Sequence, residues 1–386
     1  MNAGPAYTVK LIQKGLTLLG MVAVALSAPA EGGRALAAGR QVRAVVTKAG
    51  ADPTGKSDST AAIQKCIDAV SGAGGGVVFV PPGEYRIRYL TLRPHVRLAL
   101  AGGAAHATDG WTGEAAARAM DPKKSAIIRS VADRKGGWWI FLYNLVPPAD
   151  AREGFGDITV SGGVFDCQGR CLPAAFACGR NIRFENMVVK DLPNNHAFQI
   201  NGCSDVVFTN CLFAGYTFGA DHRILTRETI QLEQTSPYAI TGKPTGTPIS
   251  CPKKVSIPNR NVTVAGCWFG PSERLGPHLI ALGHHGTPRS CNGLVFKGNV
   301  VVEPLYCGLR LANVSNALVE GNTFISTKET ERLAEDSAIV CLWGKAALQK
   351  GEKGVTLRGN RGRLGPKSPL KKLWVSEPRK SEVSIE

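Results

Sequence analysis

The sequence lacks the features that mark several common classes of protein. Asn-Gly and Asp-Gly pairs, which build tight hairpins, are scarce, and this disfavours a β-sandwich, the competing all-β architecture. The longest apolar run, residues 15–26, is too short to span a bilayer comfortably. No later segment approaches a membrane-spanning length, so we expect no stable membrane insertion of the mature protein. Aromatic residues are 7% and charged residues 20% of the chain, as in an ordinary globular protein.

Two further absences concern partners and metals. No basic motif interleaved with aromatic residues is present, which disfavours nucleic acid as a partner. The spacing Cys167-x-x-x-Cys171 has no neighbouring pair of histidines, so a zinc site there is disfavoured. Calcium would need clustered carboxylates, and only Glu233 with Glu228 or Asp221 is available. We therefore predict no metal and no cofactor, with calcium unsupported.

What the sequence has instead is a short pattern that returns six times. Each copy is a strand of alternating apolar residues, a polar or glycine turn ending in Asn or Cys, and a second short strand. The tightest spacing between copies is about 23–24 residues, typical of a supersecondary unit that is copied and stacked. Such strands cannot bury a face alone, so we predict an all-β, right-handed, single-stranded parallel β-helix. The copies begin at Asn181, Asp205, Asn261, Gly293, Asn316 and Gly354.

A short helix is predicted ahead of the repeats. Asp58 is placed to cap its N-terminus, and the glycines at 74–76 end it. An amphipathic helix at this point would cover the open end of the β-helix core, as terminal caps must. Its apolar face falls at i, i+3, i+4 and i+7 on Ile63, Cys66, Ile67 and Val70.

The same segment carries a family resemblance. The run from Gly50-Ala51 through Asp58 to Ile67, followed by Gly74-Gly-Gly and Pro81-Pro-Gly-Glu-Tyr85, resembles the N-terminal signature of the pectate-lyase-like superfamily. That superfamily includes the family 28 glycoside hydrolases (polygalacturonases and rhamnogalacturonases) and related lyases and epimerases. The stretch 157–169 resembles its recurring strand-turn-strand. The resemblance covers most of residues 45–360 and implies the fold and a carbohydrate-active function, but no particular reaction.

Three segments are predicted along the chain. Residues 1–37 are expected to be a signal peptide, with Lys10 and Lys14 before the apolar run and small residues for cleavage after Ala30 or Ala37. An uncleaved anchor is the alternative. Residues 38–365 are expected to form the β-helix and residues 366–386 a basic, solvated tail. We therefore predict a secreted, periplasmic or cell-envelope protein.

Cysteine usage and charge give further expectations. An exported protein can form disulfides, and eleven cysteines leave at least one thiol over. Cys211 and Cys267 share one register of the repeat, so we expect stacked core thiols there. A net charge of +16 favours a polyanionic partner, such as a uronic-acid polysaccharide or an anionic envelope polymer. The better disulfide candidates are Cys167, Cys171, Cys178, Cys251 and Cys291.

A candidate groove comes from four consecutive coils, whose strands start at His196, Glu228, His278 and Gly308. Period-2 alternation turns their apolar residues inward and their polar residues outward. Gln199, Gln231 and Arg310 then form one outward column, and Asn201 and Glu233 form the next. We further place His196 and Glu228 at strand entries, and His284 and His285 at a strand exit.

These residues predict an exported enzyme that cleaves a polysaccharide, most simply an anionic one. A glycoside hydrolase is slightly favoured because Glu233 and Glu228 are both available. Five residues apart in one strand, they should face opposite sides unless Glu228 lies in the preceding turn. The alternatives are a lyase, with a histidine or arginine as base, and a non-catalytic glycan- or envelope-binding protein. The predicted catalytic residues are Glu233, Glu228, His196, His284 and Arg310, and the predicted substrate-binding residues are Gln199, Asn201, Gln231, His285, Trp138 and Trp139.

One difference from the family 28 pattern limits the reactions that we expect. The family 28 pattern carries Asn-Thr-Asp, Asp-Asp, Gly-His-Gly and Arg-x-Lys elements, and its enzymes invert between two spaced carboxylates. In the corresponding places this chain has Asn201-Gly-Cys, Gln231-Leu-Glu, Gly283-His-His-Gly and Arg310-Leu-Ala. The histidine and arginine elements are kept in outline, but the three aspartates are absent. Ordinary polygalacturonase activity is therefore disfavoured.

Overall fold

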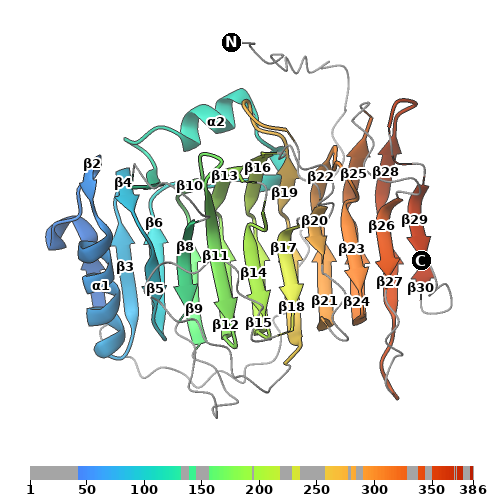
Figure 1. Cartoon of the computed structure of the whole chain (residues 1–386), viewed down its shortest axis with the longest axis horizontal. Helices are drawn as coiled ribbons and strands as arrows, with labels where there is room; N and C mark the ends of the chain where they lie inside the picture. Colours follow the sequence, from blue (N-terminus) through green and yellow to red (C-terminus); the bar gives the residue numbers. More distant parts are fainter. Residues whose placement is uncertain are drawn as a thin grey trace, which may run out of the picture. The chain divides into compact units, whose positions relative to one another are not determined.

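The computed structural model of the chain describes residues 42–131, 139–144, 156–193, 195–217, 228–234, 257–276, 280–283, 290–327, 338–343, 350–368, 370, 372–376 and 383–385. The predicted signal peptide, residues 1–37, lies outside these residues. From Val42 onward the chain forms three long parallel sheets, and successive strands pass from one sheet to the next (Figure 1). This is the predicted right-handed parallel β-helix. The ladders between its strands are all parallel, which excludes a hairpin-built sandwich.

Sheet A has eleven strands and begins most copies of the repeat. The first residues of these copies adopt a left-handed backbone, with φ of 48° at Asn181, 56° at Asp205 and 80° at Gly293. Asn, Asp and Gly tolerate this conformation best, which explains the residue types at these positions. The strands are β1 (Val42–Val45), β3 (Gly76–Val80), β6 (Val96–Leu100), β9 (Gly156–Ser161), β12 (Arg180–Glu185), β15 (Ser204–Thr209), β18 (Asn259–Ala265), β21 (Cys291–Lys297), β24 (Val314–Glu320), β27 (Val355–Arg358) and β30 (Val383–Ile385).

Sheet B has ten strands, which supply the second strand of each repeat. A buried asparagine opens several of its turns: the Asn299 amide donates to the Val264 carbonyl at 2.9 Å, and the Asn322 amide donates to Phe296 at 2.8 Å. These bonds pair backbone groups that stacking would otherwise leave buried and unpaired. The strands are β2 (Thr54–Asp58), β4 (Gly83–Ile87), β7 (Ala126–Ser130), β10 (Val164–Asp166), β13 (Val188–Leu192), β16 (Leu212–Tyr216), β19 (Trp268–Gly270), β22 (Val300–Val302), β25 (Thr323–Ser326) and β28 (Arg361–Leu364).

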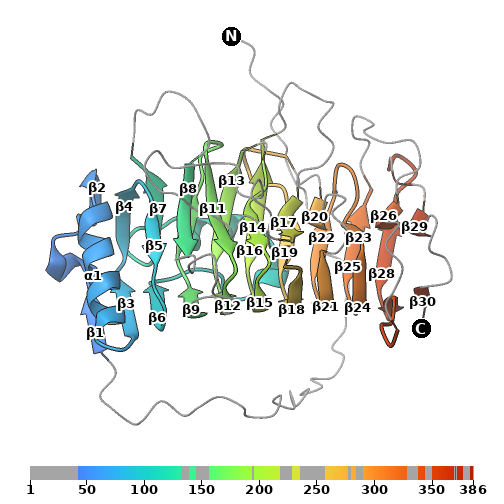
Figure 2. The same ribbon diagram turned by 60° about the horizontal axis from the view of Figure 1, so that its bottom comes forward.

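Sheet C has nine strands, among them the strands for which a groove was predicted (Figure 2). Its strands are β5 (Leu90–Leu92), β8 (Trp139–Asn144), β11 (Cys171–Ala177), β14 (Phe198–Asn201), β17 (Glu228–Glu233), β20 (Ile280–Gly283), β23 (Leu309–Ala312), β26 (Ala338–Trp343) and β29 (Lys372–Ser376). Strands β29 and β30 extend sheets C and A beyond residue 365, where we expected the β-helix to end.

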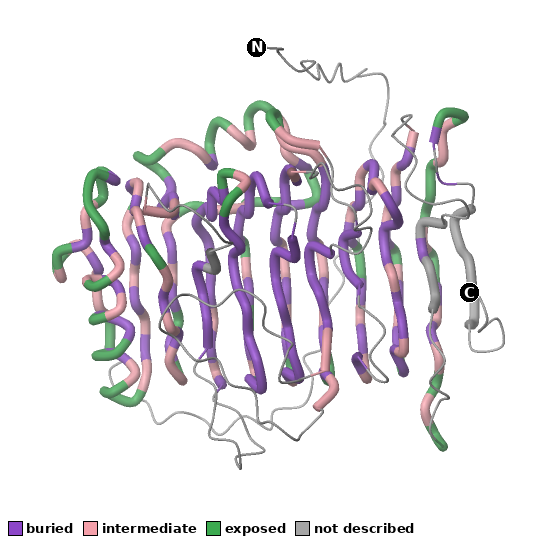
Figure 3. The backbone as a smooth tube through the Cα atoms, in the orientation of Figure 1, coloured by how far each residue is buried: buried purple, intermediate pink, exposed green. Residues whose placement is uncertain are grey.

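The core is one continuous apolar column between the three sheets, and buried backbone runs through the central coils (Figure 3). Phenylalanine rings stack along it from coil to coil. The Phe184 ring lies 4.7 Å from Phe208 and 5.3 Å from Phe176, both stacked, and 5.0 Å from Phe198. The inward positions predicted for the groove strands are all buried: Phe198, Ile200, Ile230, Leu232, Ile280, Leu282, Leu309 and Leu311.

The predicted cap is helix α1 (Thr60–Gly72), preceded by the short 3-10 helix η1 (Val46–Ala49). Its buried residues are the four predicted, Ile63, Cys66, Ile67 and Val70. The expected N-cap was wrong by one residue. Ser59 is the N-cap, and Asp58 precedes the helix and accepts hydrogen bonds from the backbone and hydroxyl of Thr60.

The cysteines divide differently from the prediction. The stacked pair is confirmed, since both thiols are buried and the Cys211 backbone N–H donates to the Cys267 sulfur at 3.4 Å. The disulfide prediction is wrong for Cys167, Cys171, Cys178 and Cys291, which are buried and form no disulfide. Cys167, Cys171 and Cys291 pack inside the helix as small apolar side chains. Cys251 lies outside the described residues.

A segment of residues 101–125, here called the strap, connects β6 to β7 over the outer face of sheet B (Figure 1). It contains the 3-10 helix η2 (Ala107–Asp109) and helix α2 (Gly113–Ala119), neither of which we predicted. Apolar side chains of the strap pack on outward residues of sheet B. Because the strap covers these outward positions, they are apolar, and the sequence of sheet B lacks the polar positions of a solvent-facing surface there. In the part of the chain that the structure describes, no helix is long and apolar enough to cross a membrane.

Candidate functional site

The two outward columns form as predicted. Sheet C aligns Gln199 with Gln231, Gln231 with Gly283 and Gly283 with Arg310, while Asn201 aligns with Glu233. Side chains from positions far apart in sequence therefore meet on neighbouring strands about 4.8 Å apart. Within β17, the Gln231 amide donates to the Glu233 carboxylate at 3.1 Å. The columns give one continuous polar strip on sheet C.

A buried histidine and a buried carboxylate lie at the entry of the same strands. The Nδ1 atom of His196 is 2.9 Å from Oε2 of Glu228 and 3.4 Å from the Glu228 backbone nitrogen. The Glu228 backbone N–H donates to Nδ1, and the Glu228 carboxylate lies beside the same nitrogen. The Asn195 side chain accepts from the His196 backbone N–H at 2.8 Å, which fixes the start of β14. His196 and Glu228 are therefore one coupled unit.

The two glutamates of β17 are close enough to interact, so the expectation that they face opposite sides was wrong. A Cβ built on Gly283 would lie 2.8 Å from Cγ of Glu228 and 3.0 Å from Cβ of Arg310. The Glu228 side chain thus lies over Gly283, inside the outward column. The pKa of Glu233 is raised to about 7, first by burial and then by the negative charge of Glu228.

Burial separates the predicted residues into two groups. His196, Gln199, Asn201, Glu228 and Gln231 are all buried, and Glu228 is 0% exposed. Among the outward residues on these strands that the structure describes, Glu233 and Arg310 keep partial exposure. A ligand approaching the strip therefore meets Glu233 and Arg310 first, with the buried residues behind them.

The buried polar atoms behind these two residues are not all matched. Within the described part of the chain, the side-chain oxygen of Gln199 is buried without a hydrogen-bond partner. Such groups are costly to bury in an apolar setting, and functional sites are where proteins keep them.

Several predicted residues cannot be placed. His284, His285 and Trp138 lie outside the described residues, and Trp139 is described only as the first residue of β8. Among the described side chains, no group of three His, Cys, Asp or Glu residues gathers to hold a metal ion.

Two residues that we did not predict position the site. The Asn259 amide is fully buried and donates to the Glu233 carbonyl at 2.9 Å, and the Gly202 backbone N–H donates to the same oxygen at 2.9 Å. Together they fix the end of β17. Gly283 leaves the space that the Glu228 side chain occupies. The period-2 pattern could not identify either residue, because Asn259 belongs to another sheet and Gly283 contributes by having no side chain.

Gly283→Ala tests this use of space. The new methyl group would overlap Glu228 and Arg310, so we expect a loss of stability of about 1–3 kcal/mol and a fall of at least about tenfold in any activity of the site. Thermal unfolding and turnover are the two measurements. Gly72→Ala is the matched control, since nothing lies within 4 Å of its added Cβ. Equal behaviour of the two variants would contradict this placement of Glu228.

Comparison with known proteins adds a family match and a set of relatives. Residues 43–124 match the family model described as rhamnogalacturonase A/epimerase, pectate lyase-like. A mannuronan C5-epimerase of Azotobacter vinelandii is 51% identical over 61 residues, 14% of this chain and 7% of that protein. Alginate lyase 7 of the same organism is 37% identical over 97 residues, 22% of this chain and 10% of that protein. These similarities cover short stretches only.

A longer similarity is to a surface protein. The chain is 28% identical over 306 residues to the plasmin and fibronectin-binding protein A of Streptococcus pneumoniae, covering 71% of this chain. It spans 38% of the length of that relative. The crystal structure of PfbA, a surface adhesin of the same species, superposes with a TM-score of 0.66 at 21% identity, covering 89% of this chain and 79% of that one. This likeness shows the fold.

Proposed function

Since the chain is a pectate-lyase-like parallel β-helix, we propose that it is an exported enzyme that cleaves a uronic-acid polysaccharide by β-elimination on sheet C. We base this on one observation: Glu233, partly exposed at the polar strip, has a carboxyl group whose pKa is raised to about 7. A base with a pKa near the working pH is both deprotonated and strong enough to take a proton.

In the proposed β-elimination, residues of the polar strip act on the substrate directly. Glu233 removes the proton at C5 of a uronic acid unit, the electron pair forms the C4–C5 double bond, and the bond from C4 to the linking oxygen breaks. The leaving oxygen takes up a proton from Glu233 or from solvent. Arg310, also partly exposed, neutralises the substrate carboxylate as negative charge spreads onto it. Burial and then the negative charge of Glu228 keep the pKa of Glu233 high, and His196 contacts the Glu228 carboxylate behind the strip.

Hydrolysis, which the sequence slightly favoured, is the less supported reaction. Glycoside hydrolases need two carboxyl groups in contact with the sugar or the attacking water. Glu228 is 0% exposed and contacts His196, so only one of the two glutamates is open to a substrate. The net charge of +16 favours an anionic polymer in either case.

A product assay tests the reaction. The purified protein is incubated with uronic-acid and neutral polysaccharides, and the ultraviolet absorbance of unsaturated sugars and the number of reducing ends are followed together. We expect both to rise with a uronic-acid polymer. A rise in reducing ends without a rise in absorbance would show hydrolysis instead of elimination. Exchange of the C5 proton for solvent deuterium without cleavage would indicate an epimerase. If absorbance, reducing ends and deuterium content all stayed constant, the proposal that the protein is an enzyme would be contradicted.

A second candidate function is a surface-binding module. It is favoured by the similarity over 71% of the chain to a plasmin and fibronectin-binding protein. In that case immobilised fibronectin or plasmin should bind the chain saturably, and Glu233→Gln should leave this binding unchanged. Absence of saturable binding, together with product formation in the assay above, would exclude this candidate.

A further inference from the structure

A cavity of about 190 Å³ lies under the strap, on sheet B rather than on sheet C. Val188 of β13 and Leu212 of β16 line it from the sheet. The indole of Trp111 lines it from the strap, together with polar side chains of the same segment. At about 30 Å³ per water molecule, the volume corresponds to about six waters, which is the scale of one small ring-shaped ligand.

The strap that forms this cavity is held at its first half by two asparagines. The side-chain oxygen of Asn210 accepts from the Ala107 backbone at 2.7 Å, and its amide donates to the Ala105 carbonyl at 3.0 Å. The backbone carbonyl of Asn186 accepts from Ala104 at 2.8 Å. Ala107 and Ala119 are buried against the outer face of sheet B. The cavity is therefore preformed, which lowers the entropic cost of binding.

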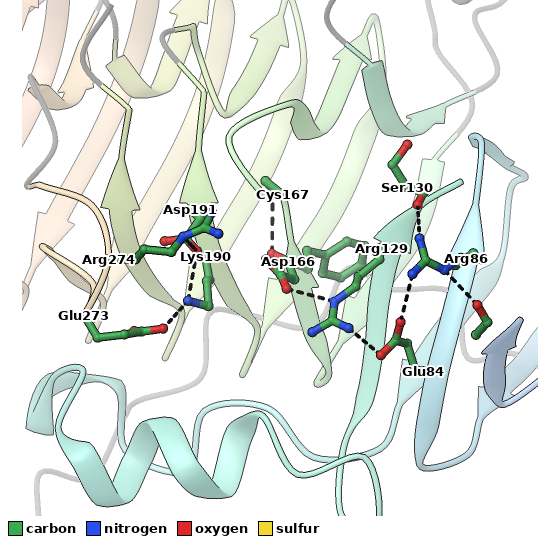
Figure 4. A network of polar contacts seen from close by, with 12 residues as sticks. Glu84, Arg86, Arg129, Ser130, Asp166, Cys167, Lys190, Asp191, Glu273 and Arg274 are labelled. Atoms are coloured by element: carbon green, nitrogen blue, oxygen red, sulfur yellow. Dashed lines mark hydrogen bonds and ion pairs between the residues drawn. The ribbon is translucent and has the colours of Figure 1, made fainter. Parts of the chain in front are cut away.

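The orientation of Trp111 is also fixed. Its indole N–H donates to the Glu273 carboxylate, and the Lys190 ammonium lies 5.7 Å from its ring centroid. Glu273 and Lys190 belong to a charged cluster with Asp191 and Arg274 (Figure 4). Burial by itself would raise the pKa of Glu273, but the bonds from Lys190 and Trp111 outweigh it and lower the pKa. A charged acceptor thus anchors the ring at neutral pH.

The chemistry of the lining selects an amphipathic, uncharged ligand. An indole and the aliphatic Val188 and Leu212 offer apolar surface, while Asp109, Glu114 and Arg118 are exposed at the rim. Carboxylates accept from hydroxyl groups and a guanidinium donates to them. His106 also lines the cavity beside these three charged side chains, and the two acids disfavour an added carboxylate. We propose that this cavity is a binding site for a single neutral sugar unit, separate from the strip on sheet C.

Titration of the full chain with glucose, galactose and mannose, and with glucuronate and galacturonate, tests the site by calorimetry. We expect a neutral hexose to bind in the millimolar range and the uronates to bind at least about tenfold more weakly. Trp111→Ala should weaken the neutral sugar at least about tenfold. Lys123→Ala is the control, because Lys123 is exposed near the end of the strap and does not line the cavity.

Further variants guard against a folding defect in Trp111→Ala. Glu114→Ala and Arg118→Ala alter exposed residues, so they should fold normally and still weaken the sugar at least about threefold. Glu233→Gln should not change the affinity, which separates this site from the proposed active site. The proposal is overturned if no neutral hexose binds, if the uronates bind more tightly, or if the three cavity variants bind as the wild type does.

Discussion

Glu233→Gln lowers kcat by at least about a hundredfold, because the amide cannot accept the C5 proton that the carboxylate removes. The amide keeps the size of the side chain and its place beside Gln231, so substrate affinity should change little. Steady-state kinetics on the best polymer of the panel gives both quantities. Glu185→Gln, in a partly exposed position on sheet A, is the matched control and should turn over like the wild type.

The pH profile of the wild type also tests the assignment of Glu233 as the general base. The pKa of Glu233 is raised to about 7, and a base must be deprotonated to act. We expect kcat to rise about tenfold per pH unit below pH 7 and to level off above it. If Glu233 acted instead as the general acid of a hydrolase, kcat would fall above pH 7. The direction of this limb therefore distinguishes the two reactions with one set of rate measurements.

Stability against pH gives a test without any substrate. The folded pKa of Glu233 lies above its ordinary value of 4.5, so the ionised form is disfavoured in the folded protein. The stability that the neutral carboxyl group preserves is lost as pH rises from about 4.5 through 7. The free energy of unfolding of the wild type should therefore fall relative to that of Glu233→Gln over this window. A constant difference would contradict the raised pKa.

Phe184→Ala lowers the free energy of unfolding by about 3–5 kcal/mol. Its ring is fully buried and packs against three other rings, those of Phe176, Phe198 and Phe208. Removing it leaves a cavity in the middle of the aromatic column, which neighbouring coils cannot close without moving their own rings. Denaturant unfolding followed by circular dichroism measures the loss.

Two controls distinguish the loss of ring packing at Phe184 from a general defect of strand β12. Phe184→Leu keeps most of the volume and should cost under about 1.5 kcal/mol. Arg183→Ala changes the adjacent, exposed residue of β12 and should stay within about 0.5 kcal/mol of the wild type. A loss of the same size in all three variants would indicate a defect of strand β12 rather than of the aromatic column.

The repeat predicted the fold because the geometry of each coil is determined by residues close together in the sequence. Asparagine, aspartate and glycine open the copies where a left-handed backbone is needed, as at Asn181 and Asp205, and alternation sends Phe198 inward and Gln199 outward. The same alternation placed Gln231 and Glu233 in their columns. These are properties of neighbouring residues, so one sequence suffices to predict them.

The disulfide prediction shows the limit of such reasoning. Spacing made Cys167, Cys171 and Cys178 candidates for bridges, yet all three are buried and form no disulfide. A cluster in sequence becomes a cluster of sulfurs only if the side chains converge, and the coil geometry decides that. The missed helix α2 has a similar origin, because its apolar side chains pack on residues of sheet B far away in the sequence.

The sequence by itself determined the parallel β-helix, its capping helix and the membership of the polar columns, since short-range periodicity governs all three. Only the tertiary structure decided that Glu228 lies over Gly283 and that burial and the charge of Glu228 raise the pKa of Glu233. It also decided that Glu233 and Arg310 keep partial exposure and that Trp111 lines a cavity under the strap. The physical reason is that burial and charge interactions depend on which segments stack beside one another, and residues far apart in the sequence, such as Glu228 and Gly283, meet only in the folded coils.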